Sequence, residues 1–185
     1  MNLTAEQKSA LLEIAWRSIE TGLRTNAPPD IDSTTFTETL NNPGASFVTL
    51  EKNGQLRGCI GSLEPYRVLV KDIAHNAFSA AFNDPRFPPL QAHELPDLTL
   101  EISVLTPPSD LQFTDELDML QQLVPHEDGI VLIDGPHRAT FLPQVWEQLP
   151  SPEDFISHLK NKAGLPADYW SDHIRVQRYR VEKFG

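Results

Sequence analysis

Two short stretches of the chain hold most of the side chains that could do chemistry. The first, LRGCIGSL at residues 56–63, places Arg57 two residues before Cys59, the only cysteine. The second, the proline-rich segment NDPRFPP, holds Asp84 and Arg86. A thiol can act as a nucleophile, and guanidinium groups match the geometry of carboxylate and phosphate oxyanions. The two stretches therefore suggest either a thiol site or an anion-binding site.

Cys59 has two interpretations. A lone cysteine is commonly a small buried hydrophobe, and burial beside Val48 would disfavour its charged form. Alternatively, Arg57 on the same strand face favours the thiolate and makes Cys59 a nucleophile. Glu64, which follows the motif, is then the nearest candidate general base, although a carboxylate at a helix start, favoured by the helix dipole, explains it more simply. Cys59 and Glu64 are the candidate catalytic residues.

Arg57 is the stronger sign of binding. An arginine inside a strand that is covered on both faces is costly to bury unless it meets a carboxylate or an anionic ligand. One interpretation is an ion pair with Asp84 that locks the loop to the sheet; the other has Arg57 and Arg86 holding a carboxylate or phosphate. Gly58 has no side chain, which in a strand marks a bulge or a close approach by backbone or ligand. The candidate ligand-binding residues are Arg57, Gly58, Asp84 and Arg86.

A β-hairpin is expected to position the motif. Residues 46–51 are rich in aromatic and β-branched side chains, and the following Asn53-Gly54 favours a two-residue type I′ turn. This register would place the arginine and the thiol on the face of the apolar side chains of the first strand. The predicted pairs are Lys52 with Gln55, Leu50 with Arg57, Val48 with Cys59 and Phe47 with Ile60.

Helices and strands are expected along the rest of the chain. A capping box at Thr4 begins a helix from about residue 5 to Gly22, and Pro65 suits the first turn of a helix over 66–82. Alternation and buried-strand patterns predict further strands, and N-cap signals predict further helices. We expect strands at 98–104, 129–134, 138–142 and 174–181, and helices at 115–123 and from Ser151 to about Gly164. The basic residues of the last strand are expected to form a solvated edge.

Composition excludes several classes of protein. The formal net charge of −11 argues against direct nucleic-acid binding, which depends on neutralising phosphates. We find no apolar run of membrane-spanning length, no signal-peptide pattern, no nucleotide-binding glycine loop and no metal-ligand spacing among the six histidines. A single cysteine fits a reducing compartment. We therefore expect a cytoplasmic protein without a cofactor or metal.

Four motifs in order resemble the AMMECR family, and most closely its bacterial and archaeal branch, the AmmeMemoRadiSam system protein A. They are LRGCIG at 56–61, DPRFPPL at 84–90, EISVLT at 101–106 and TFLPQVW at 140–146. The resemblance implies an α+β fold with mixed or antiparallel sheets and packed helices. It also implies a single domain over residues 1–185, made of two closely packed lobes that meet at the LRGCIG motif. As partners it implies a Memo-like protein and a radical SAM protein, but it implies no reaction.

Three functional hypotheses result. In the first, the chain is a cytoplasmic component of that three-protein system and binds a small anionic ligand or a partner's peptide in a cleft at the LRGCIG motif. In the second, it is an enzyme with Cys59 as nucleophile. In the third, the motif is purely architectural, and the function resides on another surface.

Overall fold

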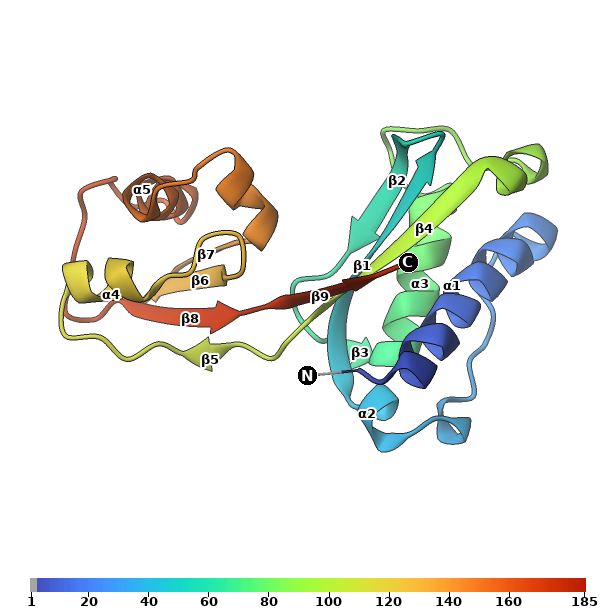
Figure 1. The fold of residues 1–185 in the computed structure, drawn as a ribbon, viewed down its shortest axis with the longest axis horizontal. Helices are drawn as coiled ribbons and strands as arrows, with labels where there is room; N and C mark the ends of the chain where they lie inside the picture. The colour runs from blue at the N-terminus through green and yellow to red at the C-terminus, as the bar shows by residue number, and fades with distance from the viewer. Residues whose placement is uncertain (1–2) are drawn as a thin grey trace. The chain divides into compact units, whose positions relative to one another are not determined.

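The computed structural model describes residues 3–185, which divide into two compact units (Figure 1). Unit 1 comprises the chain up to Leu105 together with Glu182–Gly185, and unit 2 comprises Thr106–Val181. Both units combine helices with antiparallel sheets. The predicted α+β class is therefore confirmed.

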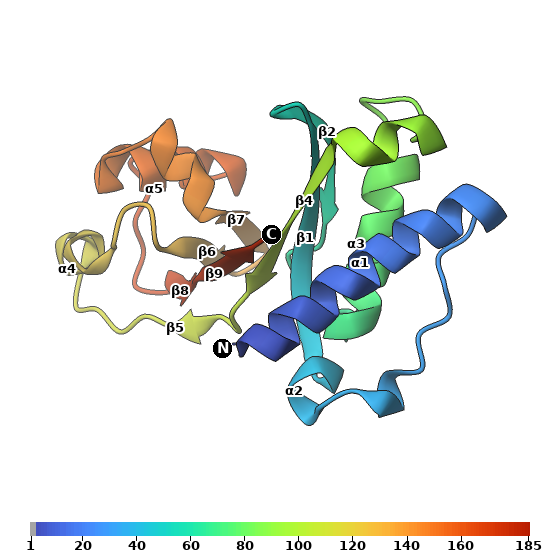
Figure 2. The ribbon, with the colours of Figure 1, turned by 45° about the vertical axis from the view of Figure 1, so that its right-hand side comes forward.

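Unit 1 is a twisted sheet covered on one face by helices. Its strands lie in the order β2-β1-β4-β9, and the short strand β3 also pairs with β1. Figures 1 and 2 show α1 and α3 along the same face of this sheet. The elements are α1 (Ala5–Thr25), η1 (Ser33–Thr35), α2 (Glu38–Asn41), β1 (Pro43–Lys52), β2 (Gln55–Gly61), β3 (Arg67–Val68), α3 (Leu69–Phe82), η2 (Ala92–Asp97), β4 (Leu98–Leu105) and β9 (Val181–Phe184).

The core of unit 1 lies between these helices and the sheet. Leu11 and Ile19 of α1, Ile73 of α3, and Val48 and Leu50 of β1 are fully buried there. Each such side chain contributes about 1.5–3 kcal/mol to folding through the area removed from water. Ala80 of α3 lies directly against Gly58 of β2, so helix and strand approach closely.

The first helix begins where it was predicted and ends later. The capping box at Thr4 is present. The helix continues past Gly22 and ends at Asn26, which takes the left-handed conformation with a φ of 56°. Gly22 serves packing instead, because a Cβ there would overlap the ring of Phe82 on α3. The prediction that Gly22 ends the helix was therefore wrong.

The prediction that a helix begins near residue 66 was also wrong. Arg67 and Val68 form β3 and pair with Gly44 and Pro43 of β1, so α3 begins only at Leu69. Glu64 consequently lies in a loop rather than at a helix N-terminus. The acidic residue in the first turn of α3 is Asp72.

The hairpin forms, but with a shifted register. Lys52 pairs with Gln55 as predicted, and a β-bulge between Leu50 and Glu51 leaves Arg57 without a partner in the ladder. Because side chains alternate, a shift of one residue exchanges the two faces. Cys59 therefore lies opposite Thr49 and not Val48. The observed pairs beyond the bulge are Leu50 with Gly58, Thr49 with Cys59, Val48 with Ile60 and Phe47 with Gly61.

Unit 2 has its own sheet and its own core. The strand order is β5-β8-β6-β7, and the ring of Trp146 stacks on that of Phe155 at a centroid distance of 3.8 Å. The predicted strands and helices from residue 115 to 164 are confirmed. The elements are β5 (Ser109–Asp110), α4 (Glu116–Gln122), β6 (Gly129–Asp134), β7 (His137–Phe141), η3 (Pro143–Glu147), α5 (Pro152–Lys162) and β8 (Arg175–Tyr179).

The last predicted strand is two strands. The strand is interrupted at Arg180, so β8 belongs to the sheet of unit 2 and β9 to the sheet of unit 1. The basic side chains are solvated as expected, with that of Arg175 61% exposed, but β8 is not an edge strand, because it lies between β5 and β6. Its arginines form ion pairs: Arg175 with Asp110 at 3.2 Å, and Arg178 with the buried Asp128 at 3.6 Å.

Candidate functional site

The two stretches singled out in the sequence lie against each other in unit 1. The backbone N–H of Cys59 donates to Oδ2 of Asp84 at 2.9 Å. Nη2 of Arg86 donates to the carbonyl oxygen of the same cysteine at 3.2 Å. The segment after α3 therefore holds both polar backbone groups of Cys59, in the middle of β2.

Arg57 is bound elsewhere. Its Nε and Nη2 donate to the two carboxylate oxygens of Glu94, each at 3.0 Å, and Nη2 also donates to the carbonyl of Pro88 at 2.9 Å. The predicted ion pair between Arg57 and Asp84 was therefore wrong. The side chain is buried, with the residue 9% exposed, and among the described residues its Nη1 has no hydrogen-bond partner.

Glu94 is the functional neighbour that sequence reasoning missed. The hydrogen bonds from Arg57 lower its pKa to about 2 against the cost of burial, and the Gln91 N–H and the Lys52 ammonium act in the same direction. Glu94 also belongs to a capping box with Gln91 at the start of η2. The three-residue spacing of Gln91 and Glu94 was the one signal in the sequence that could have drawn attention to Glu94. It indicates a helix start and not a partner for Arg57.

Asp84 and Arg86 form a bidentate pair. Nε and Nη2 of the arginine lie 2.9 and 2.6 Å from the two carboxylate oxygens. This bond, with the Cys59 N–H, holds the pKa of Asp84 well below its usual range, and it raises the pKa of Arg86. The Asp84 side chain is 2% exposed and that of Arg86 is 53% exposed. Arg86 is thus the member of the pair that solvent or a ligand can reach.

The two arginines share one aromatic ring. The guanidinium carbons of Arg57 and Arg86 lie 5.8 and 5.5 Å from the ring centroid of Phe87. Cations at this range are attracted to the ring's quadrupole. Phe87 therefore gathers two positive groups beside β2.

Gly58 and Cys59 take different faces of β2. A Cβ at Gly58 would overlap the carbonyl oxygen of Ala80, so glycine permits the close approach of β2 to α3. The close approach expected at this glycine is thus made by helix backbone. Cys59 is half-buried on the other face, where the Thr49 hydroxyl donates to its Sγ at 3.3 Å. Glu64 lies in the following loop and accepts a hydrogen bond from the Tyr66 hydroxyl at 3.1 Å.

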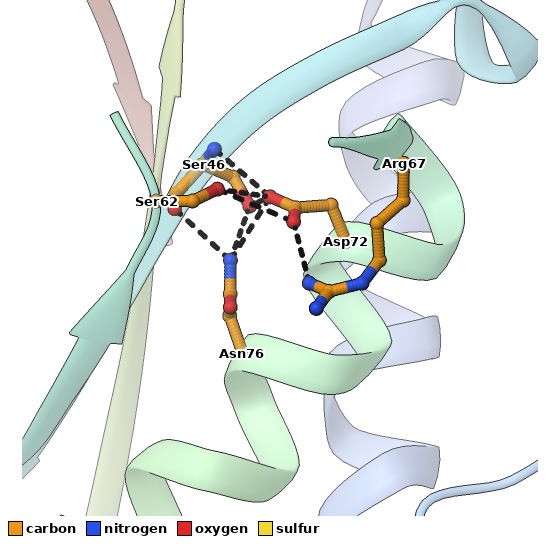
Figure 3. A network of polar contacts seen from close by, with 5 residues as sticks. All are labelled: Ser46, Ser62, Arg67, Asp72 and Asn76. Carbon is orange, nitrogen blue, oxygen red and sulfur yellow. Dashed lines mark hydrogen bonds and ion pairs between the residues drawn. The ribbon is translucent and has the colours of Figure 1, made fainter. Parts of the chain in front are cut away.

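A second polar cluster joins the end of the motif to α3, and the sequence analysis did not find it (Figure 3). The buried carboxylate of Asp72 accepts from the Ser46 hydroxyl at 2.7 Å, from Asn76 at 2.9 Å and from Arg67 at 3.0 Å. Ser62, just after β2, donates to the same carboxylate at 3.3 Å. Burial raises the pKa of Asp72, opposed by the hydrogen bonds from Ser46, Ser62 and Arg67 and by the charge of Arg67.

A signal for this cluster existed. Asp72 and Asn76 are spaced i, i+4, so they share one face of α3, and both contact Ser46 of β1, so this face meets the sheet. Polar side chains within such a face are buried and require partners.

Within residues 3–185, no three His, Cys, Asp or Glu side chains are grouped so that they could bind a metal ion. None of the helices in this range has the length and apolar character needed to span a membrane.

Comparison with known proteins places the chain among relatives of similar length. The AMMECR1 family model matches residues 12–184. A protein of Methanothermobacter thermautotrophicus is 36% identical over 192 aligned residues, covering 98% of this chain and 95% of that protein. A Thermotoga maritima protein is 34% identical over 172 residues, covering 92% and 94%. The crystal structure of the uncharacterized protein PH0010 from Pyrococcus horikoshii superposes with a TM-score of 0.73 at 31% identity, covering 94% of this chain and 88% of that one.

Proposed function

We propose that this chain, which belongs to the AMMECR1 family, is a binding component of a system with a Memo-like protein and a radical SAM protein. In this proposal, the surface around Arg86 beside β2 receives an acidic group, carried by a partner's peptide or by a small ligand. The partner proteins follow from the resemblance of the four sequence motifs. The binding chemistry follows from the side chains around Cys59.

The observation that carries the proposal is the exposed guanidinium of Arg86. Its partner Asp84 is buried, so the pair presents its positive member to solvent. The guanidinium groups of Arg86 and Arg57 both lie near the ring of Phe87. A positive group held rigidly in a chain of net charge −11 is suited to a specific carboxylate or phosphate. Arg86 would contact the ligand, while Arg57, Gly58 and Asp84 hold the backbone that positions it.

Exposed apolar side chains near the motif favour a peptide as the ligand. Among residues 3–185 four large apolar side chains are exposed, and three of them lie within residues 56–66: Leu56, Leu63 and Tyr66. Exposed apolar groups beside a charged anchor are typical of protein interaction surfaces. A partner segment that pairs one carboxylate with apolar side chains fits this chemistry.

The experiment is native mass spectrometry of the purified chain mixed with the Memo-like and radical SAM proteins of the same genome. We expect a complex with the wild type, and Arg86→Ala should weaken it roughly tenfold or more, since hydrogen bonds between charged groups contribute about 1.5–3 kcal/mol. The matched control is Arg175→Ala, which removes another exposed arginine paired with an aspartate, on β8 of unit 2.

The proposal fails if the wild type forms no complex, or if the two arginine variants bind equally well. If Arg57→Ala and Cys59→Ala both lose melting temperature while binding is retained, the motif is architectural. The function then resides on another surface.

A second candidate is an enzyme with Cys59 as nucleophile and Glu64 as general base. The observation that favours it is geometric: the Thr49 hydroxyl donates to Sγ at 3.3 Å, and the Arg86 guanidinium donates to the cysteine's own carbonyl. Reactive cysteines are commonly found close to a cationic group. Iodoacetamide labelling against pH tests this idea. A thiol that reacts only near or above about pH 8.5, the value of a free cysteine, is not activated.

A further inference from the structure

Strand β2 lies at one edge of the unit 1 sheet, and the outward backbone groups of Cys59, within this strand, are occupied. The sheet order begins with β2, so its only neighbour within that order is β1. At Cys59 the N–H and the C=O bind Asp84 and Arg86 instead of a strand. We call these two side chains, with their bonds to Cys59, the edge clamp.

The edge clamp supplies the hydrogen bonds that a neighbouring strand would supply. A strand offers a carbonyl acceptor to an N–H and an N–H donor to a carbonyl. Here a carboxylate oxygen accepts at 2.9 Å and a guanidinium nitrogen donates at 3.2 Å. Because both groups are charged and paired with each other, these bonds are stronger than those of a strand.

The strand has no protection of its own. Natural edge strands are commonly blocked by an exposed charge, a proline or a short length. Strand β2 is seven residues long and contains no proline, and its single charge, on Arg57, is buried against Glu94. Its exposed side chains include Leu56. Such a strand is expected to pair with another chain unless something else covers its edge.

We infer that the edge clamp closes β2 against antiparallel pairing with β2 of a second copy of this chain. This inference does not depend on the proposed partners, because it concerns the chain alone. It also predicts the register of the blocked contact. The outward groups of Cys59 would exchange hydrogen bonds with those of Cys59 in the second copy.

The register can be read from the cysteine itself. Directly opposed residues in a hydrogen-bonded antiparallel pair have Cα atoms about 5.5 Å apart, which is within the range that a disulfide bridges. Cys59 is the only cysteine, so any disulfide must join two chains at this residue. Diamide, which takes two electrons and two protons from the two thiols and is reduced to the hydrazine, would report the contact as a covalent dimer.

The test variant is Asp84→Ala with Arg86→Ala, which removes both bonds to Cys59 without changing the net charge. We expect the mass of the variant in sedimentation velocity to rise with its concentration. It should approach twice the mass that the wild type has at low concentration. We also expect diamide to give a covalent dimer several-fold faster than in the wild type. Adding Leu56→Lys should reverse both effects, because an exposed lysine blocks edge pairing.

The matched control is Glu101→Ala with Lys183→Ala, which removes another charge-neutral pair from the unit 1 sheet, 3.6 Å apart and half-exposed. This control variant should sediment and form the disulfide-linked dimer as the wild type does. Circular dichroism and exchange of the Cys59 amide establish that the test variant is folded and that the edge has opened. If the double variant does not fold, Arg86→Ala alone, which frees only the carbonyl, takes its place.

The inference is overturned if a folded variant with a fast-exchanging Cys59 amide keeps the mass of the wild type at every concentration. Association without a Cys59 disulfide also overturns it, because the contact would then lie on another surface. Association that Leu56→Lys leaves unchanged has the same meaning.

Discussion

At the scale of single residues, the site consists of two ion pairs, and one of their four charged groups is exposed to solvent. Arg57 is bound by Glu94, and Asp84 by Arg86, so each buried charge has its counter-charge within hydrogen-bond distance. Such pairs hold their partners in one geometry more than they add stability, since desolvation offsets much of the attraction. Arg86, half in solvent, is the exception on which the proposed binding depends.

Glu94 gives unit 1 a pH dependence in acid. Its pKa is lowered from 4.5 to about 2, so between these values the unfolded chain binds more protons than the folded one. The contribution of Glu94 to the free energy of unfolding is complete above about pH 4.5 and is lost as the pH falls toward about 2. Asp84, whose pKa is also lowered, acts in the same direction.

The measurement is urea unfolding of the wild type and of Glu94→Gln at a series of pH values. We expect the wild type to be more stable at neutral pH, and the difference to shrink steadily below about pH 4.5. A difference that stays constant down to pH 2 would mean that Arg57 does not lower the pKa of Glu94 in the folded protein.

The residues that could be predicted are those that lie within the two motifs LRGCIG and DPRFPPL. Arg57, Cys59, Asp84 and Arg86 stand out by type and by their proline- and glycine-rich surroundings, and the structure brings all four together. Glu94 could not be assigned, because 37 positions separate it from Arg57 and one β-bulge decides which carboxylate the guanidinium meets.

At the scale of elements, boundaries depended on tertiary contacts. The Asn53-Gly54 turn fixes how the hairpin starts, but the bulge at Leu50 arises within the sheet and no turn residue signals it. Likewise, Pro65 is compatible with the first turn of a helix, yet the pairing of β3 with β1 means that α3 begins only at Leu69. Local patterns therefore located the elements, and long-range hydrogen bonds set their ends.

The cluster around Asp72 is what attaches the end of the motif to α3, and its loss should be costly. Asp72→Ala leaves Ser46, Asn76 and Arg67 without their acceptor, so we expect the free energy of unfolding to fall by roughly 3 kcal/mol or more. Asp72→Asn should cost less, because the amide oxygen still accepts. Thermal and urea unfolding measure both.

Asp32→Ala is the control for this prediction. Asp32 is an exposed cap that accepts from the N–H of Thr34, and its removal should lower the free energy of unfolding much less than the loss of Asp72 does. Equal losses in Asp72→Ala and Asp32→Ala would show that the buried cluster contributes no more than an ordinary cap.

At the scale of the whole molecule, the chain has two separate hydrophobic cores. One is packed between α1, α3 and the sheet of unit 1, and the other surrounds Trp146 and Phe155 in unit 2. Composition and the family resemblance were sufficient for the α+β class. They were not sufficient for the exchange of sheets at Arg180, because a basic strand pattern continues through that residue without a break.

Separate cores predict separate losses. Phe155→Ala should destabilise unit 2 by about 3–5 kcal/mol, the usual cost of removing a buried aromatic ring, because it leaves a cavity beside Trp146. Hydrogen exchange should then rise in β6 and α5 while α1 and α3 keep their protection. The reciprocal variant is Ile19→Ala, which should affect unit 1 alone. If both units lose protection in both variants, they unfold as one cooperative body.

Strand β9 has a consequence for how the chain is made. Unit 2 is continuous in sequence, whereas the sheet of unit 1 takes its last strand from residues that follow the whole of unit 2. Because domains tend to fold as they leave the ribosome, the second unit can be finished while the first still lacks a strand beside β4. During translation, the edge of β4 that will pair with β9 therefore remains unpaired while more than seventy further residues are synthesised. Chaperones that shield unpaired strands would meet the nascent chain at that side.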